Sequence, residues 1–178
     1  ISSNGRLQIN TVRPKSMSIL EAQAGLIGEK VVWDNDGVSS ASKLQLIHCE
    51  SIQEEGMQLE DAKVIVAGGG GLGAADGFNL LSELAKALNA AVGATRVPVD
   101  EKWVPHHMEI GQTGKIVSPD VYIAVGISGA AQHVTGILGS GKIVAINKDP
   151  DANIFRVADY GWVADYKKAL PLLIESLK

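Results

Sequence analysis

The feature that most constrains the fold is a repeated alternation of short apolar runs, turns and helix-like segments, beginning near Ala62. Residues 63–67 form a nearly continuous apolar run, which is typical of a strand buried on both faces of a parallel sheet. The glycines of residues 68–73 follow, and residues 76–88 then have the apolar spacing of an amphipathic helix. Because the order of apolar strand, turn and helix is repeated along the chain, the sequence predicts an α/β fold with a doubly wound parallel sheet.

The remaining elements of this sheet are predicted from the same pattern. Strands are expected at residues 90–95, 121–126, 142–146 and 157–163, with a terminal helix at 166–177. Another helix is expected to begin at Ser128, and Pro171 either interrupts or restarts the terminal one. Ligands of such sheets bind outside the carboxyl ends of the strands. There Asn147 and Asp165 either bind ribose hydroxyls or cap turns.

The N-terminal third reads differently. Residues 7–12, 29–33 and 43–50 resemble short strands without clear helices between them, and residues 54–60 resemble a polar linker. We therefore expect a short β-rich N-terminal segment in front of the doubly wound domain. The first residues lack the basic and then apolar pattern of a secretory signal, and there is no initiator Met, so we expect a processed chain or part of a longer one.

Composition excludes several classes of function. The 178 residues carry a net charge of −4, so no positive charge steers the chain to nucleic acid or an anionic membrane. The longest apolar runs are too short to span a bilayer. Cys49 is the single cysteine, which excludes a disulfide within the chain and favours a reducing, cytosol-like compartment.

The most informative stretch for function is residues 111–133, which reads GQTGKIVSPDVYIAVGISGAAQH. It holds two glycine turns around the predicted strand at 121–126. Because the turn at residues 126–129 leads into a predicted helix, backbone N–H groups are expected to converge on an anion there. This favours a phosphate-bearing cofactor. The side chains expected within its reach are Gln112, Thr113, Ser128, Gln132 and His133.

Residues 68–73 satisfy G-x-G-x-x-G between a strand and a helix, the pattern of a diphosphate site, although a flexible glycine turn gives the same letters. An NAD site would also need Asp or Glu at the end of the next strand to hold the ribose. That strand ends in Thr95 and Arg96, so a cation stands where the carboxylate belongs. Arg96 is then either a surface cation or a partner for an anionic or electron-rich ligand.

Two catalytic signatures fail. A P-loop would place a glycine at Glu109 and a magnesium-binding Ser or Thr at Ile116, so we reject nucleoside triphosphate hydrolysis. His106 and His107 are adjacent and do not have the spacing of zinc ligands, so a surface loop is expected there.

Four segments together resemble the FAD-binding domain of the electron transfer flavoprotein alpha subunit. They read GQTGK, GISGAAQH, INKDPDANIF and ADYGWVAD, and the match runs from about residue 63 to the C-terminus. The segment INTVRP also resembles the end of that subunit's N-terminal domain. The resemblance implies that residues 1–60 are a remnant of the N-terminal domain with a linker. Residues 61–178 would then form a Rossmann-like FAD-binding domain.

The resemblance also implies where FAD is held. Arg96 would lie over the flavin ring and favour its reduced, anionic forms, with Thr95 and Thr113 near N5. His133 would face the O2 side, and the loop from Ser128 would serve the phosphates. The predicted FAD-binding set is Gly70, Thr95, Arg96, Ile110, Gly111, Gln112, Thr113, Ser128, Gly129, Ala130, Ala131, Gln132, His133, Tyr166 and, at the adenosine end, Asn147 and Asp165.

Two positions depart from the family pattern. Family members usually carry an arginine inside the first glycine loop, where this chain has Gly70, so one phosphate contact or its charge is lost. Ser commonly precedes the arginine that faces the ring, and here Thr95 keeps the hydroxyl.

The family implies an electron carrier rather than a free-standing enzyme. It forms a heterodimer with a beta subunit, accepts electrons from acyl-CoA or related dehydrogenases, and passes them singly to an acceptor flavoenzyme or quinone reductase. The compartment would be the bacterial cytoplasm or the mitochondrial matrix. The residues alone leave two other readings open, an NAD(P)-binding dehydrogenase domain and a module that senses AMP or ADP.

Overall fold

The computed structural model describes residues 20–25, 27–32, 46–49 and 57–177. Described residues up to Cys49 belong to one unit and those from Met57 to another. The strands predicted at 29–33 and 43–50 are wrong where they can be checked, because residues 29–32 and 46–49 form no strand and are exposed. A strand needs a partner for its backbone groups, which an apolar pattern alone does not supply. The strand predicted at 7–12 lies outside the described residues.

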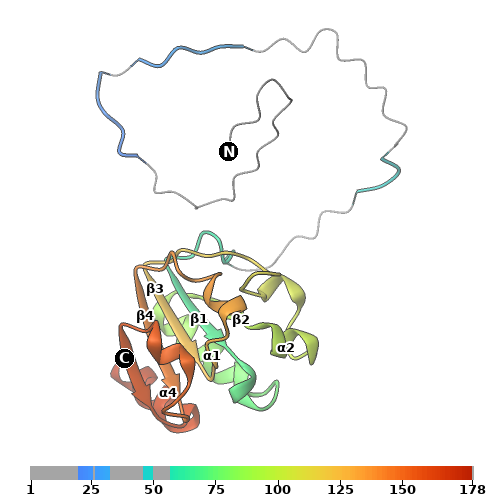
Figure 1. The fold of residues 1–178 in the computed structure, drawn as a ribbon, viewed down its shortest axis with the longest axis vertical. Coiled ribbons are helices and arrows are strands. Elements are labelled where there is room, and N and C mark those ends of the chain that lie inside the picture. The colour runs from blue at the N-terminus through green and yellow to red at the C-terminus, as the bar shows by residue number, and fades with distance from the viewer. Residues whose placement is uncertain (1–19, 26, 33–45, 50–56, 178) are drawn as a thin grey trace. The chain divides into compact units, whose positions relative to one another are not determined.

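The larger unit is built on a five-stranded parallel sheet (Figure 1). Its strands are β1 (Val64–Gly68), β2 (Ala91–Ala94), β3 (Val121–Val125), β4 (Lys142–Asn147) and β5 (Tyr160–Val163). The order across the sheet is β2-β1-β3-β4-β5, and every neighbouring pair is parallel. The chain leaves β1 toward one edge and returns to its other side as β3. This reversal is the switch point of a doubly wound sheet, which confirms the predicted fold class.

One face of the sheet is covered by two helices. These are α1 (Gly77–Leu88) and α4 (Tyr166–Ser176), which lie against each other in Figure 1. They bury Leu81 and Leu170 against residues such as Val66 and Ile123. Of the apolar stripe predicted for α1, Leu81 and Leu84 are buried and Leu80 and Leu88 are partly buried, but Ala87 is exposed. Pro171 lies inside α4 and does not end it, since α4 continues to Ser176.

The opposite face is covered mainly by loops. Strand residues such as Ile65 and Tyr122 are paired in register and point to this side, where Ile110, Val117 and Ile154 pack on them. Leu59 also packs into this cluster, so the C-terminal part of the predicted linker is core rather than solvated chain. The loops are fixed by burial, and this makes them a rigid support for polar side chains nearby.

The short helices were the least predictable elements. The described residues hold α2 (Arg96–Asp100), α3 (Ala131–Val134), η1 (Gly70–Leu72), η2 (His106–Met108) and η3 (Asn153–Arg156). The helix expected from Ser128 begins at Ala131 and ends after four residues. Ser128 and Gly129 remain in the turn because Gly129 has a left-handed φ of +85°.

Candidate functional site

Two glycine turns meet at the switch point between β1 and β3. The amide of Gly69 donates to Val125 O at 3.0 Å, and the amide of Gly71 donates to Gly126 O at 2.9 Å. A Cβ on Gly71 would lie only 2.7 Å from Gly126 O, so the turns could not approach this closely with a side chain there. Packing between the turns is therefore a sufficient reason for glycine at this position, before any diphosphate is considered.

Three cavities follow the carboxyl ends of the strands. The Thr113 cavity, about 300 Å³, lies among the loops after β2 and β3 and α2. The Asn153 cavity, about 330 Å³, lies over β3 and β4 and shares Ser128 with the first. The Tyr166 cavity, about 200 Å³, shares Gly71, Gly126 and Asn147 with the second. Together they form an elongated site across the switch point, the place where such sheets bind dinucleotides.

The structure brings most of the predicted residues to these cavities. Those lining the Thr113 cavity are Thr95, Arg96, Ile110, Gly111, Gln112, Thr113, Ser128, Ala130, Gln132 and His133. Asn147, Asp165 and Tyr166 line the Tyr166 cavity. Gly129 lies in the turn beside them, Ala131 begins α3, and Gly70 begins η1.

Arg96 is the charged residue at the mouth of the Thr113 cavity. It is the first residue of α2, one turn before Asp100, and its Nε donates to Asp100 Oδ2 at 3.1 Å. The side chain is 69% exposed, so this ion pair orients the guanidinium without contributing much to stability. The guanidinium stays protonated, so Arg96 keeps its positive charge, which Asp100 partly offsets, and its remaining N–H groups are donors.

The sequence reasoning missed three residues that line the Thr113 cavity, the apolar Val97 and Ile127 and the charged Glu109. Glu109 forms an isolated bridge with Ala94, the last residue of β2, and it is 4% exposed. Its Oε1 accepts from Thr113 Oγ1 at 2.5 Å, and its Oε2 lies 3.3 Å from His106 Nε2. The signal in the sequence was a carboxylate directly beside the GQTGK turn. His106 is exposed on η2, as expected of the surface.

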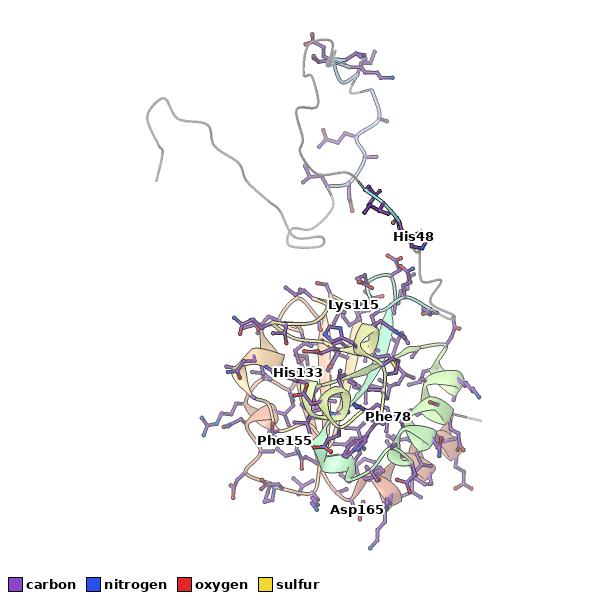
Figure 2. All side chains as sticks on the ribbon, turned by 90° about the vertical axis from the view of Figure 1, so that its right-hand side faces the viewer. His48, Phe78, Lys115, His133, Phe155 and Asp165 are labelled. Carbon is purple, nitrogen blue, oxygen red and sulfur yellow. The ribbon has the colours of Figure 1, made fainter. Side chains whose placement is uncertain are left out.

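His133 is buried at the floor of the same cavity, within the domain in Figure 2. Its Nδ1 lies 2.8 Å from Ile110 O, which can only accept, so Nδ1 carries a proton. Burial lowers the pKa of His133, although the bond to Ile110 opposes this. In the neutral ring Nε2 is then the acceptor, and the hydroxyl of Tyr122 donates a hydrogen bond to it at 3.0 Å. Burial raises the pKa of Tyr122, which keeps that proton in place.

The far end of the site is held by polar side chains that also tie the fold together. Asn147 donates through Nδ2 to Ile127 O at 2.9 Å and accepts from the amide of Asp149. Asp165, at the lower margin of the domain in Figure 2, caps α4 by accepting from the amide of Lys167 at 2.9 Å. The turn-capping alternative is therefore correct for both Asn147 and Asp165, and each still lines the Tyr166 cavity.

Tyr166 joins the last helix to the first turn. Its hydroxyl donates to Leu72 O at 3.0 Å, and its ring lines the Tyr166 cavity. Lys148 and Lys167 line the same cavity and are exposed, so they add positive charge at this end.

The described residues hold neither a metal site nor a membrane-spanning helix. No group of three or more His, Cys, Asp and Glu side chains there could hold a metal ion. No helix in the part of the chain that the structure describes is long and apolar enough to cross a membrane.

A parallel sheet with an elongated site at its switch point defines a domain that binds a nucleotide cofactor. Residues 58–138 match the family described as the electron transfer flavoprotein FAD-binding domain. The chain belongs to this family, whose cofactor is FAD. The residues fit FAD, because a row of adjacent cavities that share lining residues, together with a pair of close-packed turns, suits a long, phosphate-bearing molecule.

The curated relatives agree with this assignment. The chain is 45% identical over 173 residues to "Electron transfer flavoprotein subunit alpha" of Thermoanaerobacterium thermosaccharolyticum, covering 97% of this chain and 52% of that one. It is 45% identical to the same-named protein of Bacillus subtilis, over 94% of this chain and 51% of that one. A probable mitochondrial alpha subunit of Caenorhabditis elegans is 55% identical over 128 residues, covering 72% of this chain and 39% of that one. The chain thus spans about half the length of the first two relatives.

Proposed function

We propose that this chain is the FAD-carrying part of an electron transfer flavoprotein alpha subunit, which accepts electrons from dehydrogenases and passes them on singly. The observation that carries the proposal is the row of three adjacent cavities, in which Arg96, Thr113 and His133 line one end while Asp165 lines the other. The family assignment supports FAD as the molecule that joins these ends. FAD supplies the redox chemistry, and the chain binds it and adjusts its electrostatics.

The Thr113 cavity is proposed to hold the flavin ring. There Arg96 supplies a fixed cation, which favours reduced, negatively charged forms of a flavin. His133 is proposed to face the O2 side of the ring; because its two nitrogens are bonded to Tyr122 and Ile110, its orientation is fixed and no N–H is left to donate to the cofactor.

The two smaller cavities are proposed to hold the phosphates and adenosine. Ser128 lies where the first two cavities join, so it is placed for the phosphates. Asp165 accepts one hydrogen bond, from the amide of Lys167, when it caps α4. Its carboxylate can accept further hydrogen bonds and is therefore free to bind a ribose hydroxyl. Lys148 and Lys167 supply positive charge that offsets the loss of the family's arginine at Gly70.

The whole protein is proposed to act with partners that this chain does not contain. These are an electron transfer flavoprotein beta subunit, donor dehydrogenases, and an acceptor flavoenzyme or quinone reductase. The chain is then an electron carrier rather than a free-standing catalyst. The proposed compartment is the bacterial cytoplasm or the mitochondrial matrix, since similar proteins are named from bacteria and from mitochondria.

The test is the absorption spectrum of the purified protein, produced with the beta subunit and with the N-terminal part that the relatives have. We expect flavin bands at one FAD per heterodimer, retained through gel filtration. Calorimetric titration of the cofactor-free protein with FAD, NADH and AMP separates the alternatives. Tight binding of NADH or AMP together with no binding of FAD would overturn the proposal.

A further inference from the structure

A line of three side chains connects the protein surface to the Thr113 cavity. His106 lies on η2 with its side chain 74% exposed, whereas the side chain of Glu109 is only 5% exposed. His106 Nε2 is 3.3 Å from Glu109 Oε2, and Thr113 Oγ1 is 2.5 Å from Glu109 Oε1. Glu109 and Thr113 both line the cavity. Each oxygen of one buried carboxylate thus faces a different partner, one in solvent and one at the cavity.

The backbone holds Glu109 firmly in this position. Its amide donates to His106 O at 2.9 Å, and its carbonyl accepts from the amide of Lys115 at 2.7 Å. The loop closes tightly over it, because a Cβ on Gly114 would lie 2.8 Å from Glu109 Cγ. Burying a carboxylate is costly unless both of its oxygens are bonded. A site that only needed to orient Thr113 would be served by a neutral amide at this position.

The hydrogen bond to Glu109 also fixes what Thr113 offers the cavity. A threonine hydroxyl has one proton and two lone pairs. Since Glu109 accepts that proton, Thr113 presents lone pairs to the cavity and is set to accept a proton there. Proton transfer requires donor and acceptor within about 2.6–3.2 Å or linked by one water. The 2.5 Å contact between Thr113 Oγ1 and Glu109 Oε1 is short enough for direct transfer, and the 3.3 Å separation of Glu109 Oε2 from His106 Nε2 lies just beyond the range, a gap that a small movement of the exposed His106 side chain closes.

We propose that Thr113, Glu109 and His106 form a proton path between the flavin cavity and solvent; this rests on the function proposed above. A fully reduced, anionic flavin carries one proton more than the oxidised form, and Thr113 Oγ1 would take that proton as the electrons leave for the acceptor protein. Its original hydroxyl proton passes to Glu109 Oε1. The protonated carboxyl group of Glu109 then turns about its Cγ–Cδ bond, so that the same proton faces His106 Nε2 and passes to it, and His106 releases a proton to water. Thr113 and Glu109 end in their starting states, and reduction of the cofactor runs the same path in reverse.

The other titratable groups around the cavity do not offer an equivalent path. Arg96 stays charged and is paired with Asp100. Both ring nitrogens of His133 are bonded within the protein, to Tyr122 and to Ile110. Lys115 follows Gly114 in the same loop. Its Nζ lies 3.1 Å from Glu60 Oε2, and its side chain is only partly exposed, so it does not join the cavity to solvent.

The test measures proton release from the FAD-loaded heterodimer in a stopped-flow instrument. A pH-indicator dye reports the proton while a soluble one-electron oxidant removes the electrons. We expect Glu109→Gln to slow proton release at least about tenfold, since a positioned proton-transfer group contributes about 10²–10⁴-fold. His106→Gln should slow it less, and added imidazole should restore the rate. His107→Gln, which changes the adjacent exposed histidine, is the matched control and should leave the rate unchanged.

Three further measurements separate the possible outcomes. The midpoint potential of bound FAD should rise in Glu109→Gln, because a buried negative charge has been removed; a side chain with a purely structural role would leave it unchanged. If Glu109→Gln fails to fold, Thr113→Val breaks the same path from the cavity side and should slow proton release similarly. Wild-type rates in either folded variant would overturn the proton path while leaving FAD binding intact. A wild-type heterodimer that takes up no FAD would overturn both proposals.

Discussion

The Thr113 cavity and the Asn153 cavity lie side by side at the same edge of the sheet, but they are built from different parts of the chain. Around the first, side chains hold one another through hydrogen bonds, as His133 does with Tyr122. Around the second, the contacts involve backbone groups, as between Gly71 and Gly126 and between Asn147 Nδ2 and Ile127 O. Side-chain networks adjust charge and proton positions, whereas close-packed turns set shape. Substitutions should therefore have different consequences at the two places.

The largest effect is expected from Gly129→Ala, in the turn between the two cavities. A Cβ there would overlap the backbone amide of Ile154 and lie 2.6 Å from Asn153 C, at a left-handed φ of +85°. We expect the free energy of unfolding to fall by about 3 kcal/mol in urea denaturation. Gly73→Ala is the control, because its φ of +81° is similar but no atom lies within 4 Å. It should cost only about 1–2 kcal/mol. Equal losses would show that φ alone matters here.

A smaller loss is expected from Tyr122→Phe in the side-chain network. The variant removes the donor to His133 Nε2 and leaves a buried acceptor unpaired, which costs about 1–2 kcal/mol in the free energy of unfolding. Tyr160→Phe removes a hydroxyl from a side chain that is 64% exposed and should change nothing. A loss of the same size in both variants would contradict the assigned hydrogen bond.

The pH dependence of stability tests the same network. Burial lowers the pKa of His133 below its ordinary value of 6.5, so the unfolded chain binds more protons than the native one below that pH. Stability should therefore fall as the pH is lowered through 6.5, by at most about 1.4 kcal/mol per pH unit from this residue. His133→Asn should have a shallower profile between pH 7 and 5. Parallel profiles for wild type and variant would argue against a neutral, buried His133.

The smallest effect concerns the arginine missing from the first turn. A Cβ on Gly70 would lie 3.1 Å from Val97 Cγ1, so Val97 occupies space that a side chain there would need. We expect Gly70→Arg combined with Val97→Ala to bind FAD about fivefold tighter, equal to about 1 kcal/mol, in a fluorescence titration. Gly70→Met with Val97→Ala adds length without charge and should bind like wild type. Tighter binding by this control would remove charge as the explanation.

Local sequence patterns predicted the parallel sheet and its two long helices. Each strand is an apolar run that ends at a glycine or polar turn, as at Val64–Gly68, and α1 and α4 have the spacing of a buried stripe. The short helices were either not predicted or predicted to be longer than they are, because a helix of three to five residues is too short to show a hydrophobic period. The helix expected from Ser128 lasts only from Ala131 to Val134, since Gly129 holds the preceding turn in a left-handed conformation.

The sequence also identified most of the residues around the Thr113 cavity, through the GQTGK and GISGAAQH segments. It did not indicate that the backbone groups of the two glycine turns are hydrogen-bonded to each other. It also did not indicate that the carboxylate of Glu109 contacts both Thr113 and His106. Those facts depend on contacts between residues whose spacing in the chain carries no periodic signal. Glu109 was considered only as a position where a P-loop glycine is absent.

What the sequence determined by itself was the order of strands and turns, because hydrophobic periodicity and glycine act within a few residues. What only the tertiary structure decided was how the groups are used. Burial sets the charge of His133, and the carboxylate of Glu109 sets which way the hydroxyl of Thr113 points. Both depend on the low polarity and fixed geometry of a packed interior, which no single segment of the chain contains.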